Sequence, residues 1–296
     1  MTEQRNATPA AEVFKKQSQA KEIWRRFKKN RGAVIGLILL SAILLIIIFA
    51  DLIVPYEQAT VQDMSQKLAT PSPEHWFGMD SYGRDLFARV IHGGRTSLSI
   101  ALLATLSSCV VGSALGAVAG YFGGWVDNLI MRSLDIFMSV PDILFTMAVV
   151  FALEANFTNL LIALTLAYFT NYVRLVRSQV LNLSEQDYVE AARAGGAGSA
   201  RIIISHILPN AIGVIIVNTT LNVAKIILYE STLSFLGLGM PPPSPEWGLI
   251  LSEAREFMRR APHMMLFPAM AIVLSACSVN LIGDGLRDAL DPHLKS

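Results

Sequence analysis

Five long runs without Asp, Glu, Lys or Arg constrain this sequence more than any other feature. They cover residues 32–50, 96–126, 155–173, 202–224 and 261–283, and each is 19 to 31 residues long. A helix rises about 1.5 Å per residue, so about 20 apolar residues cross the roughly 30 Å hydrocarbon core of a bilayer. A sixth stretch, 131–153, has an apolar second half but carries Arg132, Asp135 and Asp142. We therefore predict an all-α integral membrane protein with six transmembrane helices.

Composition supports a membrane rather than a soluble protein. Hydrophobic residues make up 53% of the chain, charged residues only 16%, and mean hydropathy is +0.47, whereas soluble domains carry about 25% charge. A net charge of +1 excludes a generally basic nucleic-acid-binding protein. Cys109 and Cys277 both lie in apolar runs, which excludes a disulfide scaffold and leaves the redox compartment open.

The distribution of positive charge predicts the orientation. Nine Lys and Arg residues precede the first run, which is too long for the apolar core of a cleaved signal peptide and has no small-x-small cleavage site after it. The positive-inside rule therefore places the N-terminus in the cytoplasm. Six crossings then place both termini there, with 16 Lys and Arg inside and 7 outside.

The chain before the first run is predicted to be a cytoplasmic tail, residues 1–31, ahead of a transmembrane domain at 32–296. Within the tail, the segment 22–30 reads EIWRRFKKN, with Ile23, Trp24 and Phe27 near one helical face among basic residues. This pattern is typical of a helix lying in the membrane interface. Residues 1–12 are polar and rich in Ala and Thr, and we expect them to be disordered.

The longest cytoplasmic loop, about 174–208, is the most informative part of the chain. Ser184 and Asp187 resemble a capping box, which predicts a helix over 185–194. Gly195 and Gly196 then end this helix.

After the glycine break, residues 198–199 offer the start of a second helix that leads into the run 202–224, and Pro209 is expected to bend it. The small side chains around the break would let another surface approach the backbone closely. A solvated helical hairpin is the alternative interpretation of the loop.

The spacing of this loop resembles the EAA loop of binding-protein-dependent ABC importer permeases. The matching residues are Glu190, Ala191, Ala192, Gly196, Leu208 and Pro209. In that family the loop forms a coupling helix that docks into a cytoplasmic ATPase, so the resemblance implies that these residues, with Gly195, contact the ATPase. One departure is His206, where the family pattern has Ile.

Three further segments narrow the resemblance to the dipeptide, oligopeptide and nickel importers, and to the second, C-type permease of their pair. They are HWFGMDSYGRDLFARVIHGGRTSL at 75–98, STLSFLGLGMPPPSPEWG at 231–248 and GDGLRDALDPHLKS at 283–296. The resemblance implies the type I ABC importer permease fold in a bacterial inner membrane. It implies as partners a second permease subunit forming a heterodimer, two ATP-binding subunits and an extracytoplasmic substrate-binding protein. Di- and oligopeptides are the first expectation for the substrate; nickel, metal chelates, opines and glutathione are the alternatives.

No catalytic or cofactor site is predicted within this chain. It contains no G-x-x-x-x-G-K-[ST] sequence, and the segments 93–96 and 196–199 lack the Lys and the spacing of a phosphate cradle. We therefore expect ATP and Mg to be used by the partner ATPase subunits. The five histidines are scattered, and no metal site is expected. A membrane-embedded enzyme would need a nucleophile, acid pair or metal cluster, and a non-transporting scaffold would not need the EAA loop.

Polar residues inside the predicted spans are candidates for the translocation path. Asp142 follows Pro141 in the compromised span, and Asn218, Thr219 and Asn222 lie in the fifth run. A charge or amide in hydrocarbon must face protein or water. These side chains therefore either line the path or form hydrogen bonds between helices.

Glycines carry two further expectations. Gly112, Gly116 and Gly120 are spaced four apart, which predicts close helix packing. In the outer segment we expect a short helix from Asp85 to about His92, ended by the glycines at 93–94, that either contacts the binding protein or caps the bundle.

Overall fold

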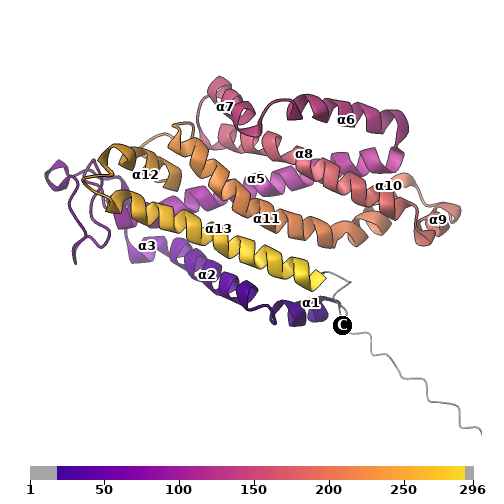
Figure 1. Ribbon diagram of the computed structural model, residues 1–296, viewed down its shortest axis with the longest axis horizontal. Helices are drawn as coiled ribbons and strands as arrows, with labels where there is room; N and C mark the ends of the chain where they lie inside the picture. The colour runs from indigo at the N-terminus through magenta and orange to yellow at the C-terminus, as the bar shows by residue number, and fades with distance from the viewer. Residues whose placement is uncertain (1–18, 291–296) are drawn as a thin grey trace, which may run out of the picture.

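The computed structural model describes residues 19–290, and this part of the chain is helical without a β-strand. The elements long and apolar enough to cross a membrane are α2 (Arg31–Ile48), α5 (Leu86–Phe122), α8 (Phe157–Ser184), α11 (Leu208–Phe235) and α13 (His263–Leu290). Together they form one elongated bundle (Figure 1). Each predicted charge-free run lies largely within one of these helices.

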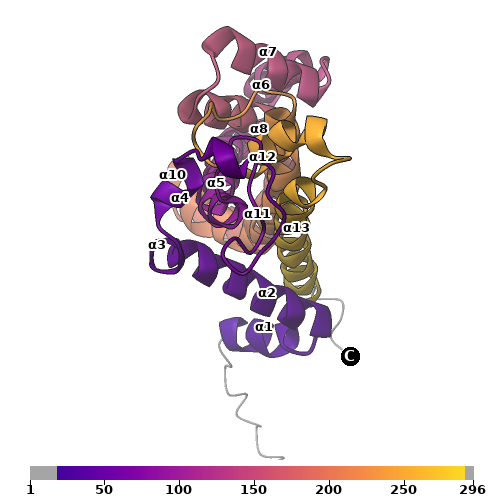
Figure 2. The ribbon, with the colours of Figure 1, turned by 90° about the vertical axis from the view of Figure 1, so that its left-hand side faces the viewer.

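The sixth span is broken. Helix α6 (Gly124–Met138) and helix α7 (Asp142–Leu153) meet at an angle of 85°. The break includes Pro141, which has no backbone N–H and disfavours helical geometry in the residue before it. Counted as one broken span, this pair completes the predicted six helices. In Figure 2, α6 and α7 lie on one side of the bundle and α2 on the other.

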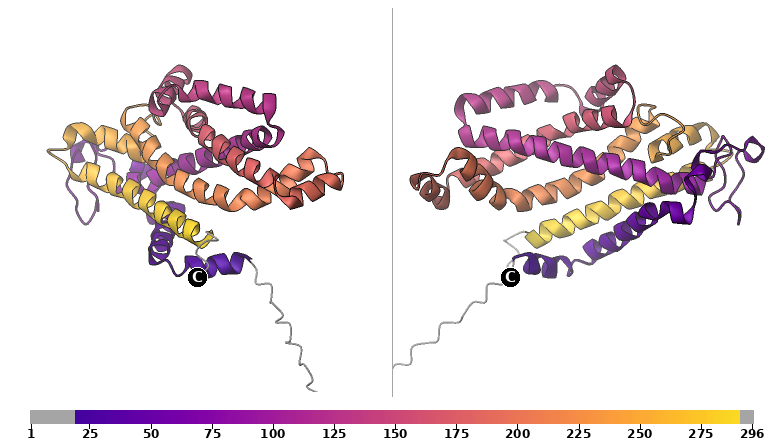
Figure 3. Two further views of the ribbon diagram at one scale, coloured as in Figure 1. Left: turned by 45° about the vertical axis from the view of Figure 1, so that its right-hand side comes forward. Right: turned by 180° about the vertical axis from the view of Figure 1, so that it is seen from behind.

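The bundle has two distinct ends, visible in both views of Figure 3. We call one the α12 end, after helix α12 (Trp247–Ala254). It also carries the short elements α3 (Ala50–Ile53), α4 (Tyr56–Thr60), η1 (Met64–Gln66) and η3 (Arg255–Phe257). We call the other the α9 end, after α9 (Asp187–Ala194), which is followed by α10 (Ser199–Arg201) and η2 (Ile202–Ile207).

A short amphipathic helix precedes the first span, as predicted. It is α1 (Gln19–Phe27), and it packs against α13 through Phe27, which is buried with Ala33 and Ala289. Trp24 stacks on Phe27 with ring centroids 5.6 Å apart. Its place at the bilayer surface stays a prediction, and the disorder expected for residues 1–12 lies outside the described part.

Helices α5 and α8 pack closely, as the glycine spacing predicted. A Cβ atom added at Gly112, Gly116 or Gly120 would lie within 2.8 Å of a backbone or Cβ atom of α8. At Gly116 the obstacle is the carbonyl oxygen of Val173, at 2.5 Å. The three glycines therefore let the two helix backbones approach along about two turns.

The prediction of a short outer helix that ends at the glycines 93–94 is wrong. Asp85 does cap the N-terminus, accepting from the amide of Ala88, but the helix continues as α5 to Phe122. Gly93 and Gly94 are buried inside it, where an added Cβ would meet the backbone of Glu246 or the side chain of Ile47. These glycines permit close contact rather than ending the helix.

A buried ionic cluster ties the outer segment to α12. Arg84 and Arg89 each bond both Asp80 and Glu253, over distances of 2.5 to 2.7 Å. Arg84 is 1% exposed, and Arg89 and Asp80 are fully buried. Two positive and two negative groups compensate each other, which offsets the high cost of burying each charge.

The α5–α8 contact makes a stability prediction. Gly116→Val places branched carbons against the backbone of Val173 and should lower the free energy of unfolding by about 1–3 kcal/mol. The matched control is Ala114→Val, because Ala114 lies on the exposed face of the same helix. Thermal unfolding midpoints of the two purified variants provide the measurement. Equal midpoints would show that this contact does not limit stability.

Candidate coupling site

The α9 end carries an exposed elbow, made of α9, the glycine turn after it and the start of α10. Helix α9 has Asp187 and Glu190 in its first turn and Arg193 in its last. This order of charges complements the helix dipole. These charges therefore stabilise a helix that has only eight residues and is exposed on one face.

The predicted capping box is wrong. Helix α8 continues through Ser184, whose hydroxyl donates to the carbonyl of Leu181 instead of capping α9. The N-cap of α9 is Gln186, which makes no side-chain capping bond. The helix consequently begins at Asp187 rather than at 185.

The glycine turn closes α9 as predicted, in a Schellman motif. The amide of Gly196 donates to Arg193 and the amide of Ala197 donates to Ala192, at 3.0 and 3.1 Å. Gly196 has φ +79°, in the left-handed region that favours glycine. An added Cβ there would meet no atom within 4 Å, so space around Gly196 is open to a partner.

A buried apolar cluster holds the elbow on the bundle. Val189 is fully buried on the inner face of α9. It belongs to the same cluster as Val180 of α8 and Ile207 of η2, and Leu208 packs against this cluster. The elbow is thus fixed by one face of α9 while its other face stays exposed.

Pro209 changes the helix in a different way from the expected bend. The six residues before Leu208, Ile202–Ile207, form a π-helical segment, and α11 continues without a sharp break. Proline has no N–H and its ring crowds the carbonyl four residues earlier, so a wider turn relieves the clash. Next to this segment, the carbonyl of His206 accepts a hydrogen bond from the side chain of Asn210, at 2.6 Å.

The structure divides the predicted coupling residues into two groups. Those exposed at the α9 end are Glu190, Ala191, Gly195, Gly196 and Pro209, while Ala192 and Leu208 are half-buried. Leu208 therefore does not lie on the exposed surface but packs against the apolar cluster that contains Val189 of α9. Sequence reasoning missed Tyr188, which is 40% exposed on α9 and adds an aromatic ring to the surface.

Sequence reasoning also missed an ion pair and a cation–π contact at the α9 end. The guanidinium of Arg177 on α8 bonds both carboxylate oxygens of Asp127 on α6, at 2.5 and 2.6 Å. The guanidinium of Arg193 lies over the ring of Tyr121, 5.9 Å from its centroid. The available signal was that Asp127 and Arg177 closely follow two predicted spans that end on the same membrane side.

The candidate path residues lie in two places: Thr219 and Asn222 lie near the hydroxyl of Tyr172, and Asp142 lies at the break in the sixth span. Asp142 is exposed as the first residue of α7, at the break in the sixth span. Asn222 is 3% exposed and lies near the hydroxyl of Tyr172 on α8. Thr219 donates to the carbonyl of Ile215 in its own helix, and Asn218 is half-buried. The position of Asn222 favours contact between helices, and a role in the path stays a prediction.

Comparisons with known proteins agree with this geometry. Residues 112–296 match the family described as binding-protein-dependent transport system inner membrane component. Residues 18–71 match the N-terminal transmembrane domain of oligopeptide transport permease C. The first match covers more than half of the chain, including the whole elbow.

Similar proteins extend the match to the full length. The dipeptide transport system permease protein DppC of Alkalihalophilus pseudofirmus is 43% identical over 100% of this chain and 97% of that protein. The glutathione transport system permease protein GsiD of Pectobacterium atrosepticum is 40% identical over 93% of this chain and 92% of that protein. An inward-facing structure of the MetNI methionine ABC transporter has a TM-score of 0.56 at 18% identity, covering 70% of this chain and 98% of that one.

Fold and elbow together define a multi-pass membrane transport subunit. The chain belongs to the family of binding-protein-dependent ABC importer permeases. Its match to the N-terminal domain of permease C agrees with the resemblance to the C-type subunit. The family is one of transport permeases and not of enzymes, and its members work with a partner permease, an ATPase and a binding protein.

The glycine turn makes a functional prediction. Gly196→Glu forces a residue with a Cβ into φ +79°, at a cost of about 1–2 kcal/mol, and adds a carboxylate to the exposed elbow. We expect normal insertion, because the spans are untouched, but loss of substrate uptake by the reconstituted transporter. Gly196→Asn is the matched control, since Asn tolerates the left-handed region and adds no charge. Wild-type uptake by Gly196→Glu at a normal membrane level would exclude the elbow as the coupling element.

Proposed function

We propose that this chain forms half of the translocation pathway of an ATP-driven importer for di- and oligopeptides. The second half is contributed by a different permease, so that the two form a heterodimer. The full-length similarity to a dipeptide permease, at 43% identity, supports the substrate class. The exposed, glycine-closed elbow at the α9 end is the single observation that supports ATP-driven transport, because it offers a rigid and accessible surface for a motor.

Two ATP-binding subunits would supply that motor. Each binds ATP with Mg, and this chain neither binds a cofactor or metal nor catalyses a reaction. One ATPase docks on the surface formed by Glu190, Ala191, Gly195 and Gly196, all of which are exposed. Movement of the elbow then passes through its buried contacts to α8 and α11, and from α8 to α6 through the ion pair of Arg177 with Asp127.

Glutathione is the second candidate substrate. Relatives with 40–41% identity are named glutathione transport permeases, which is close to the value for the dipeptide relative. Nickel, metal chelates and opines are further alternatives from the resemblance to the wider family. An extracytoplasmic binding protein delivers the substrate and sets most of the selectivity.

The transporter would lie in a bacterial inner membrane with the α9 end in the cytoplasm. The excess of Lys and Arg on that side, 16 against 7, supports this orientation. In the same orientation the buried ionic cluster of Asp80, Arg84, Arg89 and Glu253 lies at the outer end of the bundle, the end that the binding protein approaches.

Reconstitution tests the proposed function. The complex, purified through a tag on this chain and given its binding protein, should take up a labelled dipeptide only with ATP and Mg, while this chain alone shows no ATP turnover. Unlabelled glutathione serves as the competitor. ATP-dependent uptake of labelled glutathione without uptake of the labelled dipeptide would reverse the order of the two substrates, and ATP turnover by the chain alone would contradict the division of labour.

Cysteine labelling tests the orientation. With Cys109 and Cys277 replaced by Ser, a cysteine at Gln186 should react with a membrane-impermeant maleimide only after permeabilisation. A cysteine at Ser72, in the exposed segment at the α12 end, is the control and should react in intact cells. The opposite pattern would invert the topology.

A further inference from the structure

Two carboxyl groups are buried together where α11 meets α12, at the α12 end of the bundle. Glu230 lies in the last two turns of α11 and Glu246 is the N-cap of α12, and both are fully buried. Ser234 lies one turn after Glu230 on the same face of α11, and its hydroxyl donates to Glu246. The two carboxyl groups are within hydrogen-bonding reach of each other. They belong neither to the elbow nor to the ionic cluster.

Glu246 has the surroundings of a carboxylate. Its Oε1 accepts from the hydroxyl of Ser97 on α5 and from the amide of Gly248. Its Oε2 accepts from the hydroxyl of Ser234 and from the amide of Leu249. Both amides belong to the first turn of α12, where a negative charge is favourable. Glu246 therefore ties α5 and α11 to the start of α12.

Glu230 has no such surroundings. Its Oε1 has no hydrogen-bond partner within the described residues. The hydroxyl of Ser231 lies 3.5 Å from its Oε2, but this hydroxyl already donates to the carbonyl of Ile227 at 2.8 Å. An ionised Glu230 would be a buried charge without a donor, beside a second negative charge, and both effects oppose ionisation. A protonated Glu230 instead supplies the one hydrogen that the pair lacks.

No cation balances the pair within residues 19–290. Helix α11 packs against α5, α8, α12 and α13, and the charges on these helices near the pair are engaged elsewhere. Glu253 of α12 is bonded to Arg84 and Arg89. Arg95 of α5 is bonded to Asp51.

The other ionisable groups at this end also have other neighbours. Arg255 of η3 lies over an aromatic ring of α11, 5.9 Å from its centroid. His263 at the start of α13 lies against the outer segment, and Tyr168 of α8 packs on another tyrosine ring. Glu246 is therefore the charged group that faces Glu230.

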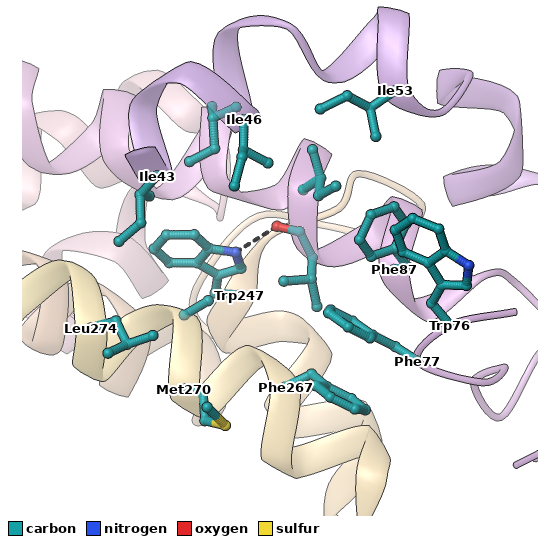
Figure 4. A pocket seen from close by; sticks show the side chains of 14 residues that line it. Ile43, Ile46, Ile53, Trp76, Phe77, Phe87, Trp247, Phe267, Met270 and Leu274 are labelled. Atoms are coloured by element: carbon teal, nitrogen blue, oxygen red, sulfur yellow. Dashed lines mark hydrogen bonds between the residues drawn. The ribbon is translucent and has the colours of Figure 1, made fainter. Parts of the chain in front are cut away.

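The start of α12 lies directly on this part of α11. A Cβ added at Gly248 would lie 2.6 Å from the carbonyl oxygen of Ser231 and from the Cβ of Ser234. Trp247 fixes the same turn to α5, because its indole N–H donates to the carbonyl of Val90 at 2.8 Å (Figure 4). The acid pair is thus shielded from water as long as α11 and α12 stay packed.

We propose that Glu230 and Glu246 share one bound proton, and that this proton latches the end of α11 to the start of α12. Glu230 carries the proton and donates it in a hydrogen bond to Glu246. When the two helices separate, water reaches Glu230, which then ionises as an exposed glutamate does at neutral pH. Separation releases one proton to the solvent, so acid favours the packed state and alkaline medium favours separation. The latch does not depend on which substrate is carried.

Infrared spectroscopy of the complete transporter tests where the proton is. A protonated carboxyl group has a carbonyl-stretch band that a carboxylate lacks. We expect Glu230→Gln to remove one such band at neutral pH, whereas Glu57→Gln, which changes an exposed acid at the same end, should remove none. Glu246→Gln should shift the band without removing it, because Glu230 keeps its proton but loses a charged acceptor. A spectrum unchanged by Glu230→Gln, or a band lost only in Glu246→Gln, would overturn the proposal.

Amide hydrogen exchange of the complete transporter tests the latch. Exchange of α12 in the wild type is divided by exchange in Glu230→Gln at the same pH, which cancels the intrinsic effect of pH on the amides. Glutamine keeps the shape and an N–H donor but cannot lose a proton, so this ratio should rise about tenfold for each pH unit above neutral. The same ratio for α9 is the control and should stay constant. A ratio for α12 that does not change with pH would show that the proton does not hold the two helices together.

Discussion

The close approach of α5 and α8 is the contact on which both ends of the molecule depend. In hydrocarbon there is no hydrophobic drive to bring helices together, so packing of small residues must hold them. Gly112, Gly116 and Gly120 allow backbone contact along about two turns. Because α5 runs the whole length of the bundle, this contact fixes the ionic cluster at one end and the elbow at the other.

Sequence reasoning succeeded where one local rule decides the structure. The spans follow from run length, and the turn at Gly196 follows from the need for positive φ after a helix. It failed where a distant contact decides. Gly93 and Gly94 read as a helix end, yet the neighbourhood of Trp247 and Ile47 makes them close-packing positions inside α5. The bidentate pair behind the elbow was likewise beyond a reading of single segments, because its partners lie 50 residues apart.

The broken span gives that ion pair a mechanical meaning. Arg177, about two turns before the end of α8, holds the start of α6 through both carboxylate oxygens of Asp127 and so couples the two helices. The 85° bend at Pro141 then separates α6 from α7. The charges that made this stretch a poor uninterrupted span are therefore compatible with a two-part element, with Asp142 at its joint.

The buried ionic cluster at the α12 end also fixes how two parts of the bundle pack. A chain with only 16% charged residues has few to spare, yet it buries Asp80, Arg84 and Arg89 almost completely. Replacing such a cluster with apolar side chains is often neutral or stabilising, so stability alone does not account for it. Its geometry does set one register: Glu253 of α12 must meet two arginines that lie five positions apart around the start of α5. That fixes α12 against the outer segment. Trp247 at the start of α12 adds a second tie, because its indole N–H donates to the carbonyl of Val90 on α5.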